Sequence, residues 1–390
     1  MKVLFCDPLN TQNNFYIFAR CLQEAGIDAH VAMDSGGMIP ESHQPGWHDR
    51  KGDEEWVHRL QFPFTLHPME YRRRQSVLCS LVKQFDLVVC SGHVPMWIHR
   101  AGVPFIFFSY GSDLDQEATQ GWSGIPRKIT LVEIVRRYFV KTLLSRSLRK
   151  ASAVVLSPYQ VRTAQKLGLK NLRFLPHIID TTLFRVVDDR EEIKRTIKKT
   201  LGCDLLLFHP PRQVWTDRSI ADCKGNDIVF RAFAEFVQGY EGRAKLVVIE
   251  KGWDVGASKR LIDELGIESS VKWLQPMPKN PMVRWYNIAD VVLDQFVVGV
   301  LALVAVEAMA CGTPVVTHVY NDTKLIYPDL PPVVNHSILG MDNTLSLLAG
   351  STATRDRLSQ EGRAWVEKNC SPKTAVPKYV ELLEEVYAHR

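Results

Sequence analysis

The chain has 390 residues, of which 46% are hydrophobic and 23% charged; these proportions are typical of a globular protein and exclude a disordered or fibrous chain. Its length exceeds what one ordinary core accommodates, so we expect two domains of similar size. The formal net charge of +5 suits an anionic small ligand or membrane surface and gives no reason to expect nucleic acid as a partner.

The eight cysteines show no CxxC spacing, and several lie in apolar runs, which predicts buried free thiols in a reducing compartment. We expect no signal peptide, because the first apolar run, Val3–Cys6, is only four residues long before Asp7. The longest apolar run, 296–306, is interrupted by Gly299 and is too short to span a bilayer. The expected location is the cytoplasm or the cytoplasmic face of a membrane.

The first half alternates strand and helix patterns, which predicts a parallel sheet with its ligand cleft at the carboxyl ends of the strands. We predict strands at 3–6, 30–33, 87–90, 104–108, 153–157 and 172–175, a helix at 15–25, and a surface excursion at 34–60. Polar groups follow two of these strands and include His93, Tyr110 and Asp113. These three are candidate catalytic residues, while a packed, satisfied histidine remains the alternative for His93.

Residues 125–150 carry eight Arg or Lys side chains interleaved with apolar ones. Together with Arg72–Arg74, such a pattern could dock on anionic lipid as a basic amphipathic surface. The ordinary alternative is a core-packing helix with a solvated cationic face. A charged stretch, 186–200, then indicates an interdomain linker and the first helix of the second half.

In the second half we predict strands at 205–209, 246–249, 271–274, 291–293 and 315–317, and helices at 226–238, 258–265, 282–288, 355–369 and 375–389. Arg212 follows the first of these strands, and Lys224 precedes the first helix. A guanidinium fork and a lysine point charge at one strand end can clamp a diphosphate and offset leaving-group charge. The alternative for either residue alone is a surface charge.

Residues 300–311 are mostly good helix formers, with Gly312 placed as a C-terminal cap and Pro314 preventing continuation. The loop and helix N-terminus around Gly299, Val300 and Leu303 form a natural anion site. Glu307 is the one acid of this apolar helix. It could hold the hydroxyls of a ribose, or it could be a buried structural acid capped by backbone groups or an arginine.

The segment 307–316, Glu-Ala-Met-Ala-Cys-Gly-Thr-Pro-Val-Val, resembles the nucleotide-sugar signature of retaining glycosyltransferases of the GT-B fold, glycosyltransferase family 4 in particular. The resemblance implies two Rossmann-like α/β domains facing each other across a cleft. Their expected bounds are 1–185 on the acceptor side and 186–370 on the nucleotide-sugar side, with a helix at 371–390 crossing back to the first domain. It also implies that Glu307 binds the donor ribose and that Arg212 and Lys224 bind the donor diphosphate.

Two sugar-side positions depart from the family pattern. The family usually has a glutamate where this chain has Gly299, and a histidine where it has Tyr110, whereas Gly111, Ser112 and Asp113 match. We interpret both departures as a change of donor pocket; lost activity is the alternative. Asp113-Leu114-Asp115 forms a DxD pattern, which we interpret as no metal site because the resemblance implies that cations replace a metal.

The sequence therefore predicts a metal-independent, retaining glycosyltransferase without a cofactor. It would use a nucleotide-diphosphate sugar and a glycan, lipid-linked or small-molecule acceptor. A GT-B sugar-nucleotide epimerase or phosphorylase and a non-catalytic nucleotide-sugar-binding subunit remain alternatives. A nicotinamide dehydrogenase is disfavoured, because no GxGxxG follows the first strand.

Overall fold

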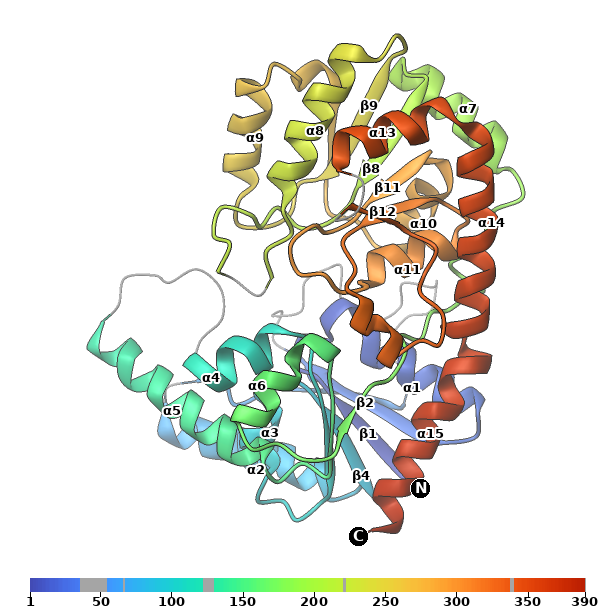
Figure 1. The fold of residues 1–390 in the computed structure, drawn as a ribbon. Coiled ribbons are helices and arrows are strands. Elements are labelled where there is room, and N and C mark those ends of the chain that lie inside the picture. The colour runs from blue at the N-terminus through green and yellow to red at the C-terminus, as the bar shows by residue number, and fades with distance from the viewer. Residues whose placement is uncertain (36–54, 66, 122–129, 220–221, 337–339, 390) are drawn as a thin grey trace. The chain divides into compact units, whose positions relative to one another are not determined.

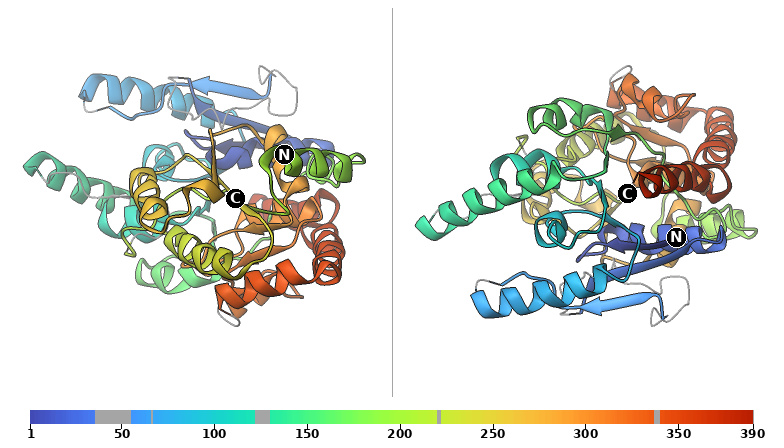
Figure 2. Two further views of the ribbon diagram at one scale, coloured as in Figure 1. Left: turned by 90° about the horizontal axis from the view of Figure 1, so that it is seen from above. Right: turned by 90° about the horizontal axis from the view of Figure 1, so that it is seen from below.

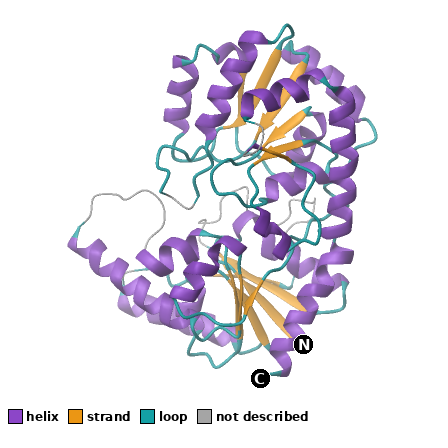
Figure 3. Ribbon diagram, in the orientation of Figure 1, coloured by secondary structure: helices purple, strands orange, loops and turns teal. Residues whose placement is uncertain are grey.

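The computed structural model describes residues 1–35, 55–65, 67–121, 130–219, 222–336 and 340–389. The chain forms two compact units (Figure 1). One contains residues 1–178 and 375–390, and the other contains residues 179–374. Each unit has a parallel sheet with helices on both of its faces (Figure 3). None of the described helices is long and apolar enough to cross a membrane.

The first unit is built on a seven-stranded sheet of order β3-β2-β1-β4-β5-β6-β7. Its strands are β1 (Lys2–Cys6), β2 (Asp28–Asp34), β3 (Val57–Leu60), β4 (Leu87–Cys90), β5 (Phe105–Phe108), β6 (Ala153–Val155) and β7 (Leu172–Arg173). Its helices are α1 (Asn14–Glu24), α2 (Pro68–Val82), α3 (Val94–Ile98), α4 (Ala118–Gln120), α5 (Leu131–Leu148), α6 (Val161–Lys166) and α15 (Pro372–Ala388). β1 and β4 are apolar on both faces, as expected for strands covered by helices on each side.

The last helix, α15, belongs to the core of the first unit. Its buried side chains include Val376, Tyr379 and Leu383, which join the cluster formed by β1, β2 and α1. The Tyr379 ring lies 5.2 Å from the Phe18 ring, and its hydroxyl donates to the carbonyl of Pro176. The predicted return of the C-terminal helix to the N-terminal domain is therefore confirmed.

The second unit is built on a six-stranded parallel sheet of order β10-β9-β8-β11-β12-β13. Its strands are β8 (Leu205–His209), β9 (Ala244–Ile249), β10 (Val271–Leu274), β11 (Val291–Leu293), β12 (Val315–Thr317) and β13 (Val334–Asn335). Its helices are α7 (Arg190–Leu201), α8 (Asn226–Gly239), α9 (Val255–Glu264), α10 (Lys279–Ile288), α11 (Leu303–Ala310), α13 (Met341–Gly350) and α14 (Thr352–Asn369). Figure 2 gives two further views of the same ribbon.

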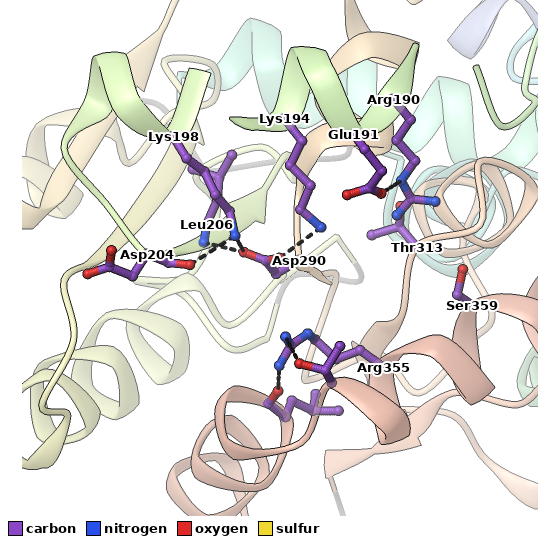
Figure 4. Close-up of polar contacts among 12 residues, drawn as sticks. Arg190, Glu191, Lys194, Lys198, Asp204, Leu206, Asp290, Thr313, Arg355 and Ser359 are labelled. Atoms are coloured by element: carbon purple, nitrogen blue, oxygen red, sulfur yellow. Dashed lines mark hydrogen bonds and ion pairs between the residues drawn. The ribbon is translucent and has the colours of Figure 1, made fainter. Parts of the chain in front are cut away.

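A buried ion cluster closes the amino edge of this second sheet, where β8 and β11 begin (Figure 4). The Asp290 carboxylate is 4% exposed, lies 2.8 Å from Lys194 Nζ and 2.6 Å from Lys198 Nζ, and accepts a hydrogen bond from the Leu206 amide. A cavity of about 620 Å³ opens beside it, lined largely by charged residues of α7. Burial alone would raise the pKa of Asp290, but the two lysines lower it, so this cluster attaches α7 to the sheet.

The structure differs from the sequence prediction in several places. The two units divide after residue 178 and again after residue 374, and not after the predicted residues 185 and 370. The predicted surface excursion at 34–60 contains the strand β3, and residues 36–54 of it lie outside the described residues. The elements that were not predicted include α2, α3, α6, β13 and α13. The helix expected from residue 300 begins at Leu303, because Gln295 Nε2 donates to the Val300 carbonyl and holds that residue in the loop.

Candidate functional site

The candidate site of the second unit lies at the carboxyl edge of its sheet, where β8, β9, β11 and β12 end. Parallel strands bring their carboxyl ends to one edge, so residues far apart in sequence meet there. Arg212 follows β8, Lys251 follows β9, and Asp294 follows β11 directly. Lys224 stands two residues before α8. Between them, Gly225 takes the left-handed conformation (φ +73°) and caps the N-terminus of the helix.

Arg212 and Lys224 share one carboxylate. The Asp222 side chain accepts a short hydrogen bond from Arg212 Nη2 and lies 2.9 Å from Lys224 Nζ through its other oxygen. Burial alone would raise the pKa of Asp222, and the two cations lower it. Both predicted diphosphate ligands are thus held side by side, with the Arg212 side chain 43% exposed and available to an anion.

Lys224 is also tied to the loop that leads into α11. Its ammonium donates to Gln295 Oε1 at 3.1 Å, and the Gln295 amide donates in turn to the Val300 carbonyl. The Phe296 amide donates to the Lys224 carbonyl at 2.9 Å. These bonds fix the loop 294–302 against the start of α8, so Lys224 is held in place relative to the loop that leads into α11.

Glu307 lies within α11 and is 3% exposed. One carboxylate oxygen pairs closely with Lys279 Nζ, and the other accepts from the Tyr286 hydroxyl at 2.9 Å. Within the described residues, a lysine and a tyrosine of α10 are the partners of this carboxylate, whereas the structural alternative expected backbone groups or an arginine. A ribose could reach Glu307 only by sharing or displacing these partners.

Asp294 is a third acid of this edge, and it links the clamp to Glu307. It is 2% exposed, and its Oδ2 atom has no hydrogen-bond partner in the part of the chain that is described. Burial raises the pKa of Asp294 to about 7; Lys224 lowers it and Glu307 raises it further. The lysine and the glutamate are thus electrostatic neighbours of one buried carboxyl group.

Lys251 adds a further cation. Burial lowers its pKa to about 8, and repulsion from Arg212 and Lys279 acts in the same direction. Arg212, which pairs with Asp222, and Lys279, which pairs with Glu307, thus lie close enough to Lys251 to act on its charge. A polyvalent anion bound beside Lys251 would offset this repulsion.

Gly299 lies under an aromatic ring. Its φ of +71° is in the left-handed region, and a Cβ added there would overlap the ring of Tyr320, with Cδ2 and Cζ each 2.6 Å away. The Tyr320 amide donates to the Gly299 carbonyl at 2.9 Å. Val300 is the acceptor of Gln295, and Leu303 is the first residue of α11. The glycine is therefore required both by its backbone conformation and by the tyrosine.

In the first unit, Asp113 organises the turn after β5. Its carboxylate accepts from the Ser109 hydroxyl at 2.8 Å and from the backbone amides of Tyr110, Gly111, Leu114 and, on the neighbouring turn, Gly92. Burial raises its pKa to about 6; Glu117 also raises it, and the Ser109 bond lowers it. Asp113 therefore holds two loops together at the carboxyl edge of the first sheet.

Tyr110 and His93 lie near Asp113 but make different contacts. The Tyr110 ring packs 5.7 Å from Phe15, and burial raises the pKa of its phenol. His93 lies between the rings of Phe64 and Trp97, with its Nε2 atom 3.4 Å from a Glu117 oxygen. The three predicted residues of this unit thus share one edge, with aromatic side chains covering two of them.

The structure brings Arg212, Lys224 and Glu307 to one edge of the second sheet and Asp113, Tyr110 and His93 to one edge of the first. Sequence reasoning missed four side chains of the second site: Asp222, Lys251, Lys279 and Asp294. For Lys251 and Asp294 a signal existed, since Asp294 directly follows a predicted strand and Lys251 stands two residues after another. Lys279 gave none, because 28 residues separate it from Glu307.

Residues 212–324 match the family model described as glycosyl transferases group 1. Among similar curated proteins is the D-inositol 3-phosphate glycosyltransferase of Acidothermus cellulolyticus, 29% identical over 153 residues, which are 37% of this chain and 32% of that protein. The match thus spans about a third of that relative's length. The homologue of Kribbella flavida is 28% identical over 192 residues, which are 43% of this chain and 45% of that protein.

Solved structures resemble the whole chain. The Anabaena protein Alr3699/HepE in complex with UDP and glucose superposes with a TM-score of 0.70, at 15% identity, over 99% of this chain and 100% of that one. Sucrose-phosphate synthase from Thermosynechococcus elongatus gives 0.68 at 16% identity over the full length of both chains. At such identities the likeness establishes the fold, which is GT-B. By sequence, the similarity to glycosyltransferases thus extends beyond residues 307–316 to the segment 212–324.

Proposed function

We propose that this chain, whose residues 212–324 carry the glycosyl transferases group 1 domain, transfers a glycosyl group from a nucleotide-diphosphate sugar to an acceptor hydroxyl. The observation that supports it most directly is the sharing of Asp222 by Arg212 and Lys224. Their charges, together with Lys251, suit a diphosphate whose negative charge grows as the glycosidic bond breaks. Transfer with retention and without a metal is part of this proposal and rests on the family resemblance.

Each group has a defined task in the proposed reaction. Arg212 would bind diphosphate oxygens with its planar fork, and Lys224 would act as a point charge next to it. Glu307 would accept hydrogen bonds from the ribose hydroxyls, with Lys279 and Tyr286 setting its orientation. The donor nucleotide is consistent with the UDP that the Anabaena neighbour binds, and the acceptor would be held by residues 1–178.

The test is a donor screen followed by a turnover assay. Thermal shifts with a panel of nucleotide sugars select the donor, and a radiolabelled form of it is then incubated with and without cell-extract acceptors. Formation of a labelled product that requires both donor and acceptor supports the proposal. Binding with neither transfer nor hydrolysis favours a non-catalytic nucleotide-sugar-binding protein instead.

We also propose that the first unit meets its acceptor at an anionic lipid surface, through α5. The N-terminal half of this helix projects from its unit (Figures 1 and 2). It carries five large apolar side chains that are each more than half exposed: Leu131, Ile134, Val135, Tyr138 and Phe139. Their spacing puts them on one helix face, and a soluble helix normally buries such a face.

The charges beside this face favour lipid over an apolar protein partner. Arg136 and Lys141 are exposed and flank it on the two sides, with Glu133 as the only acid of the helix. A basic amphipathic helix of this kind inserts its apolar face among acyl chains while its cations meet anionic headgroups. The basic residues Arg127 and Lys128, which the sequence grouped with this helix, lie outside the described residues.

Sedimentation with phosphatidylcholine vesicles, with and without 30% phosphatidylglycerol, tests this contact. The double variant Tyr138→Ser, Phe139→Ser should lose most of its binding to the anionic vesicles, and Arg136→Ala with Lys141→Ala should lose the preference for anionic lipid. Leu347→Ser, at an exposed leucine of α13, is the matched control. Equal sedimentation of all variants, or none by the unaltered protein, would refute the lipid contact.

A further inference from the structure

The loop at Gly299 borders the proposed donor site. The ring of Tyr320 occupies the space that a side chain at position 299 would take. A Cβ at position 299 would overlap the Tyr320 ring, so any side chain there and this tyrosine exclude each other. The Tyr320 ring also packs edge-on against the His318 ring, with centroids 4.8 Å apart. Its position is thus determined on one side by the glycine and on the other by the histidine.

Hydrogen bonds connect this ring to the clamp. Gln295 accepts from Lys224 through its side chain, and its backbone carbonyl accepts from the His318 amide at 2.9 Å. The Tyr320 amide in turn donates to the Gly299 carbonyl. Tyr320 lies three residues beyond β12, at the same carboxyl edge as Lys224, and is 44% exposed. Part of the ring is therefore open to a ligand held by the clamp.

The chemistry of this surface decides which sugars fit it. A carboxylate can accept hydrogen bonds from two adjacent sugar hydroxyls, whereas a phenyl ring offers an apolar face and one phenolic group. A hydroxyl buried against the ring loses its hydration without gaining a partner, which is costly. A C–H group or a deoxygenated carbon packs against the ring at no such cost.

We infer that Tyr320 forms one wall of the donor-sugar pocket and selects nucleotide-linked sugars that lack a hydroxyl on the side facing Gly299, that is, deoxysugars. The inference rests on the proposed function, since it concerns the sugar that the diphosphate clamp holds. It also accounts for the absence of a side chain at position 299: the glycine leaves room for the ring.

The experiment compares a nucleotide sugar with its deoxy analogues. With the base that the donor screen selects, the affinities for the glucose derivative and for its 3-deoxy, 4-deoxy and 6-deoxy forms are measured by calorimetry. The unaltered protein should prefer one deoxy form. Tyr320→Ala should reduce that preference by about tenfold, and Tyr320→Phe should keep it, because the ring remains.

Two controls separate this inference from the proposed function. Leu325→Ala changes an exposed side chain of the turn that follows Tyr320 and should leave the preference unaltered. The affinity for the free nucleoside diphosphate should be the same in Tyr320→Ala and the unaltered protein. A preference that does not change in Tyr320→Ala, or a preference for the fully hydroxylated sugar, overturns the inference alone. A failure to bind every nucleotide sugar overturns the proposed function and the inference with it.

Discussion

Arg212 and Lys224 meet on opposite oxygens of a single carboxylate, that of Asp222. The two cations would otherwise repel each other, so the acid keeps both in place before any anion arrives. Preorganisation of this kind lowers the cost of binding a diphosphate, because the side chains need little reordering. Asp222 thus positions the clamp, although it carries the same sign of charge as the proposed ligand.

Removing either clamp cation should abolish transfer. We expect Arg212→Ala and Lys224→Ala each to lower kcat/KM by about 100-fold or more, as loss of a charge that stabilises the transition state does. Circular dichroism should show unchanged folding. Arg243→Ala, which removes an exposed arginine paired with Asp204, is the control and should keep its activity. Rates equal to that of the control in both clamp variants would remove the clamp from the mechanism.

Glu307→Gln should separate ribose binding from structure. The variant keeps the shape of the side chain but loses its charge, so we expect at least tenfold weaker binding of a nucleoside diphosphate and unchanged binding of inorganic pyrophosphate, measured by calorimetry. Tyr286→Phe removes a hydrogen bond to Glu307 and is the comparison variant. If both variants lose thermal stability while the nucleotide affinity of Glu307→Gln stays constant, Glu307 is only structural.

Lys251 should make nucleotide binding depend on pH. Its pKa of about 8 means that its charge is lost as the pH rises through 8, so affinity for a nucleoside diphosphate should fall between pH 7 and 9. Without ligand the trend reverses: the unfolded chain holds the proton more tightly, and Lys251 contributes a rise in stability from about pH 8 to about 10.4.

Calorimetric titrations across this pH range measure the first effect. Lys251→Met should bind more weakly at pH 7 and show a flatter pH profile. Lys272→Met, at an exposed lysine of β10, should show the profile of the unaltered protein. Parallel profiles for Lys251→Met and the unaltered protein would exclude Lys251 from the diphosphate site.

Asp290→Asn should destabilise the second unit without changing the proposed site. It removes the charge that compensates Lys194 and Lys198, and breaking a buried pair costs about 3 kcal/mol. The lowered pKa of Asp290 means that its contribution is complete above about pH 4 and declines below it. The free energy of unfolding, measured in urea at pH 5, 6 and 7, should therefore differ between the variant and the unaltered protein by the same amount at each pH. A difference that grows towards neutral pH would contradict this account.

The sequence predicted elements best where burial dominates. Strands such as β4 and β8 are apolar on both faces, and their bounds agree with the prediction. Gly312 caps α11 with φ +65°, as expected from Pro314 two residues later. The start of α11 was misplaced, because a hydrogen bond from the Gln295 side chain, five residues earlier, holds the Val300 carbonyl in the loop.

The site residues could be predicted from the sequence only where a residue type and its place in the chain together indicate one function. Arg212 and Lys224 could be named because cations at strand ends suit a diphosphate. The partners that orient them could not: Asp222 is one acid among many, and the pairing of Lys279 with Glu307 depends on how α10 packs on α11. Similarly, nothing local to Gly299 indicates that Tyr320 lies over it.

The return of α15 to the first unit has a consequence for synthesis on the ribosome. The apolar side chains of α15, Val376, Tyr379 and Leu383 among them, complete a hydrophobic cluster whose other members lie within residues 1–178. These side chains are translated after the entire second unit. During synthesis, the first unit therefore keeps part of its apolar surface exposed until α15 has been translated, whereas the second unit can complete its folding before then. A chain stalled before residue 375 should consequently hold a protease-resistant second unit and a chaperone-dependent first one.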